Sequence, residues 1–301
     1  MRFLLTGVGG PAGKALVGQL AARGHWVGGT DLRDVGDGLD AFQQVCPVQS
    51  EGYLDELTRL VRAWSVDLVI PSISEELPLL AVGRRHVPAP VLVSSASAVR
   101  IADDKLLTAR RLHQAGVPAP QTDLPSSFRS LAHAVATLGG AVIVKPRVSR
   151  GGRGVRIFDA EGAEAAEAVE AWRSLDDSFV VQEFAPGTEY APVLLRERDA
   201  TVRACVPLRK TALKDGAVGN AVSVVRADGS DDVRAVAVAA ADALDLTGPA
   251  DIDVRRRADG VPVVLEVNAR FGANSAAAPE LLDAVIETCP QNARSAAPTR
   301  S

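Results

Sequence analysis

The stretch VIVKPRVSRGGRGVRIF, residues 142–158, is a β-branched run that ends in a lysine, opens into a glycine-rich turn and closes on a second apolar run. This pattern predicts two strands joined by a flexible loop, which we call the flap. Downstream, VVLEVNARFG at residues 263–272 places Glu266 and Asn268 two positions apart on a predicted strand. Their side chains leave the same face and can hold a hard cation. Together the two stretches suit a nucleoside triphosphate with magnesium.

The composition describes a globular protein of more than one core. Its 301 residues exceed what one hydrophobic core usually organises, which predicts two domains or one domain with a mobile lobe. A net charge of −4 favours neither nucleic acid nor an anionic membrane as a partner. Cys46, Cys205 and Cys289 are unpatterned, and no apolar run approaches the ~18 residues that span a bilayer. We therefore expect a cytoplasmic protein in a reducing compartment.

Strands and helices alternate along the first part of the chain. Strands are predicted at residues 2–5, 25–31, 67–71 and 91–94, with helices at 12–23, 53–64 and 75–83. This alternation predicts an α/β domain, residues 1–95, with a parallel sheet covered by helices on both faces. Residues 96–301 form the second predicted domain, which begins with a helix at 103–115 and carries the flap in a lobe around residues 125–185.

The first turn of the chain, GVGGPAG, permits a competing hypothesis. Gly7, Gly9 and Ala12 occupy the three small positions of a dinucleotide fingerprint, and Asp31 ends the second predicted strand, where an acid would bind the ribose. A NAD-dependent oxidoreductase is therefore one alternative. The same glycines also serve any tight turn between a strand and a helix that packs closely on a sheet.

The flap supplies groups suited to phosphate. Its glycines free the backbone to approach phosphate oxygens, while its polar side chains add donors and positive charge. The flap residues concerned are Ser149, Arg150, Gly151, Gly152, Arg153 and Gly154. A plain glycine hairpin with solvated arginines is the alternative interpretation, but Lys145 immediately before the flap favours phosphate binding.

A second group of residues suits magnesium. Asp253, Glu266 and Asn268 offer oxygen atoms from two adjacent predicted strands, and magnesium in proteins bridges such groups to phosphates. Arg270 shares the face of Asn268 and can reach a transferring phosphoryl group.

The order of these motifs resembles the ATP-grasp superfamily, in particular the ATP-binding halves of the carbamoyl-phosphate synthase large subunit. GVGGPAG and DLVIPSISEELPLLA are similar to its pre-ATP-grasp domain, which is Rossmann-like but does not hold ATP. DDKLLTARRLHQAGVPAPQT is similar to its entry helix, and QEFAPGTEY to its hinge. The resemblance implies a Rossmann-like domain followed by a two-lobed α+β ATP-grasp domain.

The resemblance also implies roles for individual residues. Lys105 and Lys145 would be basic contacts to the phosphates. The backbone of the hinge, at Gln182, Glu183 and Phe184, would read the adenine, and Glu189 would bind the ribose. The implied metal ligands are Asp253, Glu266 and Asn268. Arg270 and Lys145 would act in catalysis, and Arg209 or Lys210 would add a phosphate contact. The implied cofactor is Mg²⁺, with Mn²⁺ as an alternative, and the implied nucleotide is ATP.

The function that follows is an ATP-dependent carboxylate–amine ligase. A carboxylate attacks the γ-phosphate to form an acyl phosphate, an amine forms the amide, and ADP and phosphate leave. The expected partners are a small-molecule carboxylate and amine, and a homodimer is compatible with the family. Fewer than thirty residues follow Asn274, so the segments that often complete the acceptor pocket look short. This leaves a non-catalytic ATP-binding subunit as a further alternative.

Overall fold

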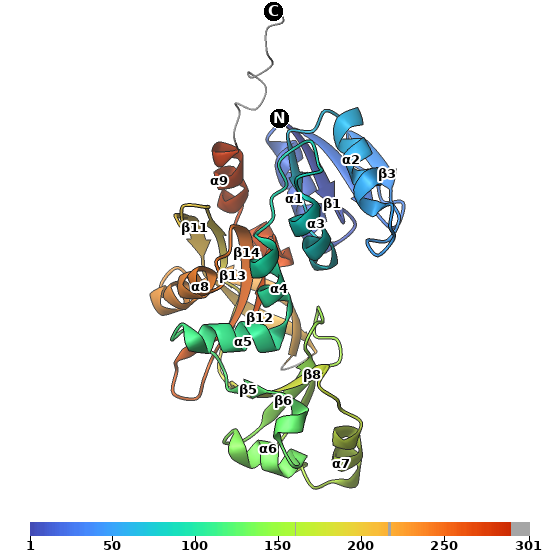
Figure 1. Ribbon diagram of the computed structural model, residues 1–301. Helices are drawn as coiled ribbons and strands as arrows, with labels where there is room; N and C mark the ends of the chain where they lie inside the picture. The colour runs from blue at the N-terminus through green and yellow to red at the C-terminus, as the bar shows by residue number, and fades with distance from the viewer. Residues whose placement is uncertain (160, 216–217, 290–301) are drawn as a thin grey trace, which may run out of the picture.

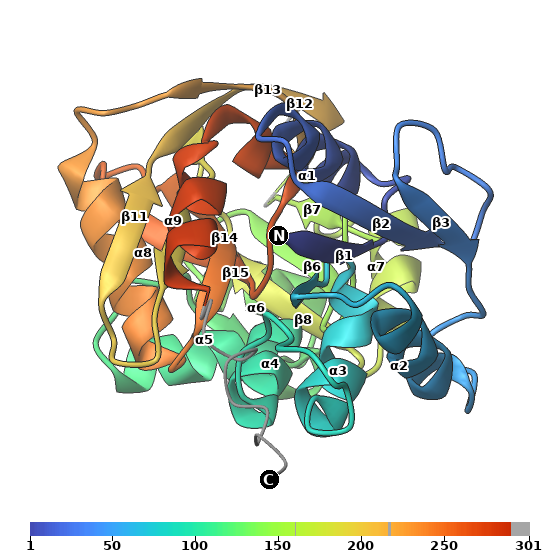
Figure 2. The same cartoon turned by 90° about the horizontal axis from the view of Figure 1, so that it is seen from above.

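The computed structural model describes residues 1–159, 161–215 and 218–289, and three sheets organise this part of the chain. An N-terminal parallel sheet and a central antiparallel sheet lie side by side, and a smaller lobe extends from the far end of the central sheet (Figure 1). The view from above shows the N-terminal strands next to the central sheet, with helices along its outer edges (Figure 2). The predicted α/β fold class is confirmed.

The N-terminal sheet has the order β3-β2-β1-β4, and its strands are parallel. Its strands are β1 (Arg2–Thr6), β2 (Trp26–Asp31), β3 (Ala41–Gln44) and β4 (Leu68–Ile70), and its helical segments are α1 (Pro11–Ala22), α2 (Tyr53–Ala63), η1 (Ser74–Glu76) and α3 (Leu77–Gly83). The prediction of a strand at residues 91–94 is wrong, since only Val91 forms a bridge, to Val69. The fourth strand is β3, whose half-exposed edge position lacks the apolar signal of a buried strand.

Close packing explains the glycines of the first turn. A Cβ on Gly7 would lie 2.3 Å from Ile73 Cγ1, and one on Gly13 would lie 2.4 Å from the Gly7 carbonyl oxygen. The Asp31 carboxylate accepts hydrogen bonds from the Gly9 and Arg33 backbone N–H groups at 2.9 and 3.1 Å. The acid that a dinucleotide would need for its ribose therefore holds the turn itself.

The central sheet is antiparallel and carries both strands that were predicted to bind metal. Its order is β11-β10-β14-β9-β12-β13, with β15 paired to β14. Its strands are β9 (Glu189–Tyr190), β10 (Val193–Arg196), β11 (Val202–Val206), β12 (Leu208–Asp215), β13 (Val218–Arg226), β14 (Gly248–Arg256) and β15 (Pro262–Asn268). The helical segments around it are α4 (Ala96–Asp103), α5 (Lys105–Gln114), α8 (Asp231–Ala243), η3 (Ala273–Ala277) and α9 (Glu280–Thr288).

The flap belongs to a separate four-stranded sheet of order β5-β8-β6-β7. Its elements are β5 (Thr122–Asp123), η2 (Pro125–Ser127), α6 (Leu131–Thr137), β6 (Val142–Pro146), β7 (Arg156–Phe158), α7 (Ala166–Arg173) and β8 (Phe179–Glu183). Strands β6 and β7 pair antiparallel on either side of the flap turn, as the sequence predicts.

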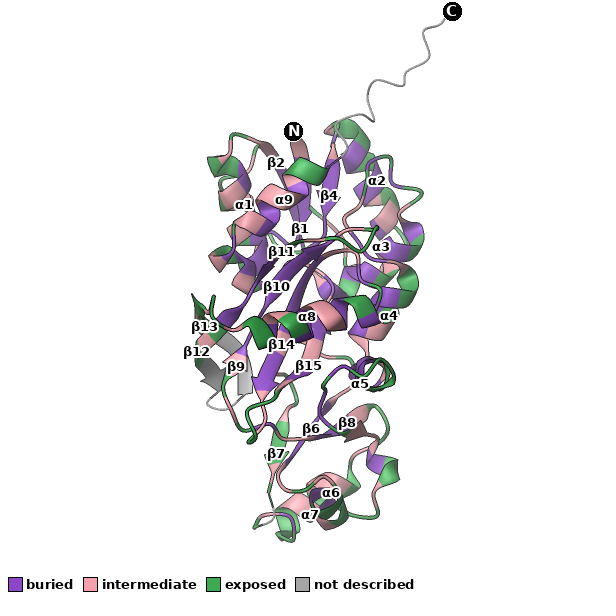
Figure 3. Ribbon diagram, turned by 90° about the vertical axis from the view of Figure 1, so that its left-hand side faces the viewer, coloured by how far each residue is buried: buried purple, intermediate pink, exposed green. Residues whose placement is uncertain are grey.

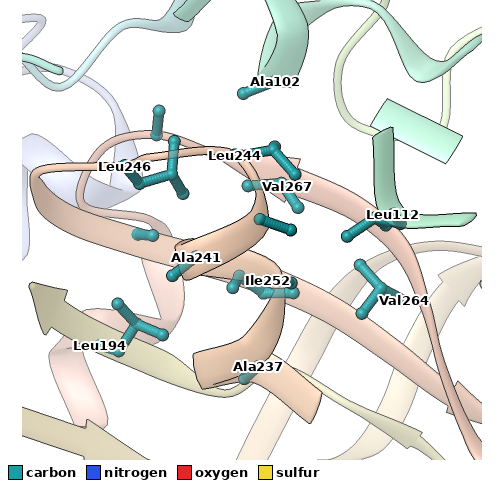
Figure 4. Packing of buried hydrophobic residues seen from close by; sticks show 14 of the residues in the cluster. Ala102, Leu112, Leu194, Ala237, Ala241, Leu244, Leu246, Ile252, Val264 and Val267 are labelled. Carbon is teal, nitrogen blue, oxygen red and sulfur yellow. The ribbon is translucent and has the colours of Figure 1, made fainter. Parts of the chain in front are cut away.

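The largest core lies between the central sheet and the helices that cover it. Leu244 and Ala237 of the α8 region pack on Ile252 and Val264 of the sheet, with Leu112 of α5 at the edge (Figure 4). The same cluster includes Leu77 and Val93, so the core continues into the N-terminal part of the chain. Burial is concentrated in the central and N-terminal strands, while the flap lobe is more exposed (Figure 3).

Among the described residues, no helix combines the length and apolarity that crossing a membrane requires.

Candidate active site

A cavity of about 350 Å³ lies where the three sheets meet. Four walls line it: the first turn with the start of α1, the loop of residues 72–75, the flap with β6, and the facing strands β14 and β15. Its predicted site residues are Lys105, Lys145, Ser149, Gly151, Gly152, Glu189, Asp253, Glu266, Asn268 and Arg270. Segments far apart in the sequence thus converge on one site.

Two buried lysines reach this cavity from different elements. Lys105 is the first residue of α5, whose N-cap Asp104 accepts backbone hydrogen bonds, and its Nζ lies 2.9 Å from the Ser149 carbonyl oxygen and 3.6 Å from Glu266 Oε1. Lys145 lies on β6, with Nζ 3.5 Å from the Leu265 carbonyl oxygen. Both ammonium groups therefore lie against β15, the strand that carries Glu266.

The electrostatics at Lys145 favour an incoming anion. Burial lowers the pKa of Lys145 to about 8, and the charge of Lys105 acts in the same direction, although Glu266 opposes the shift. The positive charge of Lys145 is buried beside the positive charge of Lys105, and the nearby carboxylates do not fully offset this unfavourable environment. The phosphates of a nucleotide would supply the missing negative charge.

The predicted metal ligands share one face of the β14–β15 hairpin. Asp253 and Glu266 are direct partners across the two strands, and Asn268 follows Glu266 on the same face. No cluster of three or more His, Cys, Asp or Glu side chains arranged for a metal occurs among the described residues. Two carboxylates and one amide fit Mg²⁺ nonetheless, because this ion usually binds one or two carboxylates and takes its other ligands from phosphates and water.

Lys210 closes the acidic side of the cavity. Its Nζ forms an ion pair with Glu189 and lies 2.7 Å from Asp253 Oδ1, while Arg255 lies 3.0 Å from the other oxygen of Glu189. Burial alone would lower the pKa of Lys210, but the two carboxylates outweigh it and raise that pKa. Burial raises the pKa of Glu189, which Lys210 opposes. Glu189, the predicted ribose ligand, is thus already held by two cations.

Asp251 is a cavity residue that the sequence did not single out. It lies two positions before Asp253 on β14 and is buried, and both of its oxygens face Asn274 Nδ2, at 3.1 and 3.4 Å. Burial, together with the charge of Asp253, raises the pKa of Asp251 to about 7. A Cβ on Gly272 would lie 1.7 Å from Asp251 Oδ2, so this position requires glycine. The two-residue spacing of DID was the available signal.

Arg270 connects the end of β15, which carries the predicted ligands Glu266 and Asn268, to the loop of residues 72–75 in the N-terminal part of the chain. Its Nε donates to Ser74 Oγ at 3.0 Å, one terminal nitrogen donates to Asn268 Oδ1 at 3.3 Å, and the other donates to the Phe271 carbonyl oxygen at 3.1 Å. Burial lowers the pKa of Arg270, and Asp251 opposes this shift. The guanidinium remains charged and is well placed to meet an anion in the cavity.

The flap turn is built from left-handed backbone positions. Gly151, Gly152 and Gly154 have φ of +66°, +72° and +74°, values that favour glycine. Gly151 and Gly152 line the cavity, and Arg150 forms an ion pair with Asp103 at the end of α4. The glycines therefore shape the turn that covers the site.

Five predicted residues do not line the cavity. They are Gly154, which belongs to the flap turn, and Gln182, Glu183, Phe184 and Arg209, none of which is among the described residues of its lining. The N–H groups of Glu183 and Phe184 donate to the carbonyl oxygens of Gln121 and Ala141. Arg209 is exposed, and Lys210, the alternative named with it, lines the cavity instead, because neighbouring residues on a strand point to opposite faces.

The comparisons with known proteins identify the family of the chain. Residues 102–274, more than half of the chain, match the ATP-grasp domain. The chain belongs to the ATP-grasp family. The resemblance to this superfamily noted in the sequence is thus confirmed.

Among its relatives, this ATP-grasp protein is 30% identical over 110 residues to cyanophycin synthetase from Trichormus variabilis (36% of this chain, 12% of that protein). It is 33% identical over 109 residues to D-alanine–D-alanine ligase from Marinobacter nauticus (36% of this chain, 33% of that protein). The matches therefore span a third or less of these relatives.

A solved structure shows the same fold over nearly the whole chain. The crystal structure of L-amino acid ligase from Bacillus licheniformis superposes with a TM-score of 0.68 at 19% identity, covering 92% of this chain and 68% of that one. The N-terminal sheet, the central sheet and the flap lobe are thus arranged as in a solved structure.

Proposed function

We propose that this protein is an ATP-dependent carboxylate–amine ligase. One observation carries the proposal: Lys105 and Lys145 line the same cavity as Asp253, Glu266 and Asn268. The cations suit the phosphates of ATP, and the oxygen ligands suit the metal that accompanies them. D-alanine–D-alanine ligase and L-amino acid ligase are named for amino acids, so we take the donor acid to be of this class.

The side chains divide the work of phosphoryl transfer. Lys105 and Lys145 would hold the phosphates, and the flap glycines would let backbone N–H groups approach them. Asp253, Glu266 and Asn268 would hold Mg²⁺, which supplies charge neutralisation and orientation at the phosphates. Arg270 would stabilise the charge on the transferring group. Positioning and electrostatics supply the catalysis, so a side-chain nucleophile is not required.

The reaction we propose has two steps. An oxygen of the donor carboxylate attacks the γ-phosphorus, the bond to the β-phosphate oxygen breaks, and ADP leaves an acyl phosphate behind. An amine then attacks the acyl carbon, phosphate departs and the amine loses a proton, which yields the amide. Closure of the flap would protect the acyl phosphate from water.

The oxidoreductase alternative receives no support from the first turn. Asp31 accepts hydrogen bonds from the Gly9 and Arg33 N–H groups, and Gly7 packs against Ile73.

We also propose a domain boundary near residue 95. Helix α4 begins one residue later, at Ala96.

Two measurements test the ligase. MgATP should raise the melting temperature of the protein by mass action, whereas NAD and NADP should not. With amino acids and other carboxylates offered one at a time, the correct acid should release ADP and phosphate, and hydroxylamine in place of the amine should yield the hydroxamate. Release of AMP and pyrophosphate would overturn the acyl-phosphate route.

A further inference from the structure

We propose that Ser74, a residue of the N-terminal domain, is a positioning residue that orients Arg270 toward the transferring phosphoryl group. The inference rests on the proposed function, because it assigns a role within phosphoryl transfer. It gives the N-terminal domain a direct part in the chemistry, although that domain contributes neither the lysines nor the metal ligands.

The contacts of Arg270 come from two domains. Asn268, the last residue of β15, accepts a hydrogen bond from one terminal nitrogen of the guanidinium. Ser74 is buried and holds Nε through its Oγ at 3.0 Å. Because a guanidinium is planar, contacts at Nε and at a terminal nitrogen together set the direction of the whole group. Loss of the Ser74 contact would leave the guanidinium held only by Asn268 and by the Phe271 carbonyl oxygen, both within two positions of Arg270 in the chain, and would remove the contact that fixes it to the loop of residues 72–75.

The loop that presents Ser74 is anchored from within the N-terminal domain. Glu76 is 1% exposed, and its carboxyl group accepts hydrogen bonds from Thr6 Oγ1, from Tyr53 OH at 2.5 Å and from the Ile73 N–H at 3.1 Å. The Ser72 hydroxyl donates to the Thr6 carbonyl oxygen at 2.6 Å. The segment that immediately precedes and follows Ser74 is thus tied to the end of β1.

Anchoring this loop with a buried carboxyl group costs free energy that a purely structural contact would not require. Burial raises the pKa of Glu76, which reflects the cost of placing a carboxyl group in the interior. An apolar side chain would fill the same space without that cost. A functional role accounts for this buried network, because the network fixes the loop that forms one wall of the cavity and carries the hydroxyl facing Arg270.

A probe that needs no donor acid can test the role. We would measure, by calorimetry, the affinity for MgADP alone and for MgADP with fluoroaluminate, which imitates the phosphoryl group in transfer. In the wild type, fluoroaluminate should tighten binding. Ser74→Ala should reduce that tightening about tenfold, because a misdirected arginine loses much of its transition-state contact, and leave the MgADP affinity within about twofold. Ser74→Thr keeps the hydroxyl and should restore the tightening.

A matched control and a double variant separate positioning from general damage. Ser94 is also buried, and its Oγ bonds to the backbone of Thr247 outside the cavity, so Ser94→Ala should bind both probes like the wild type. In an Arg270→Ala background, adding Ser74→Ala should cause no further loss.

Three outcomes would overturn the inference. Equal loss of MgADP and of the fluoroaluminate complex in Ser74→Ala would indicate a structural role. An additive loss in the double variant would show that Ser74 does not act through Arg270. A wild type that binds MgADP without tightening by fluoroaluminate would overturn the proposed phosphoryl transfer, and this inference with it, before any variant is compared.

Discussion

Two glycine-rich turns border the same cavity and use their glycines for different reasons. In the first turn, Gly7 lies at φ of +64°, but the space around the glycines is the tighter limit, since a Cβ on Gly13 would lie 2.4 Å from the Gly7 carbonyl oxygen. In the flap, the backbone is decisive, since Gly151 and Gly152 lie at φ of +66° and +72°. One turn packs two elements together, and the other shapes a covering loop. Similar composition therefore does not indicate a similar role, and only the three-dimensional surroundings of each glycine distinguish the two turns.

The comparison predicts where damage should appear. Changes at the cavity wall opposite the flap should remove activity and spare the fold, whereas changes in the first turn should remove stability and spare the site in the molecules that remain folded.

The largest effect should come from Glu266→Gln. The amide keeps the volume but lacks the charge that the metal needs, so turnover should fall about a thousandfold while the protein stays folded. The measurement is acid-dependent phosphate release, with circular dichroism as the check on folding. Glu167→Gln, on the exposed face of α7, changes the same group away from the cavity and should have no effect. Normal turnover of Glu266→Gln would remove this residue from the metal site.

Gly13→Ala should be the most damaging change in the first turn. The added methyl group meets backbone atoms that cannot move independently, so the free energy of unfolding should fall by about 3 kcal/mol in denaturant titration. Gly18→Ala is the matched control on the same helix α1, where a Cβ meets nothing within 4 Å. That variant should be neutral or up to about 1 kcal/mol more stable. Equal stability of the two variants would contradict the packing explanation.

Gly152→Ala should have a smaller effect, on the site more than on the fold. An alanine at φ of +72° is strained by about 1–2 kcal/mol, so the flap turn should rearrange and MgATP affinity should fall about tenfold in calorimetry. Gly139→Ala imposes the same kind of strain at φ of +79° in the same lobe, outside the cavity, with open space around the position. Its MgATP affinity should match the wild type, and a similar loss there would show that strain alone, wherever it lies in the lobe, weakens binding.

The smallest effect concerns protons at Lys145. Burial lowers the pKa of Lys145 to about 8 in the free protein, so near pH 8 a substantial fraction of this lysine is neutral. Phosphates favour the charged form, so MgATP binding at pH 8, where about half of this lysine is already charged, should take up at most about half a proton, and affinity should fall as pH rises above 8. Calorimetry in buffers of different ionisation enthalpy measures this uptake. Lys145→Arg stays charged and should show none.

The same shift affects stability with a definite sign. The folded pKa of Lys145 lies below the ordinary value of 10.5, so between pH 8 and 10.5 the unfolded chain binds more protons than the folded one. The contribution of this lysine to the free energy of unfolding therefore rises with pH across that interval. Below pH 8 both states are charged, and the folded state carries the cost of the buried ammonium.

Local pattern was enough for much of the site. The flap strands and the β14–β15 hairpin lie where alternation and glycine placed them, and Glu266 and Asn268 share a face because strand geometry requires it. Asp251 needed the fold, because its burial depends on Gly272 and Asn274 of a later segment. The hairpin of β12 and β13 also escaped prediction, because charged residues such as those of PLRKT interrupt the alternation that marks a strand.

The sequence by itself determined the chemistry of this protein: lysines, glycines and oxygen ligands in an order typical of ATP-grasp proteins, because residue types and short spacings are local properties. The tertiary structure decided which of these groups meet. In the folded chain, Lys210 and not Arg209 lines the cavity, and Asp31 forms a hydrogen bond within the first turn. Ser74 contacts Arg270 although the two are 196 positions apart in the chain. Contacts between segments so distant depend on how sheets pack, and no local pattern encodes that packing.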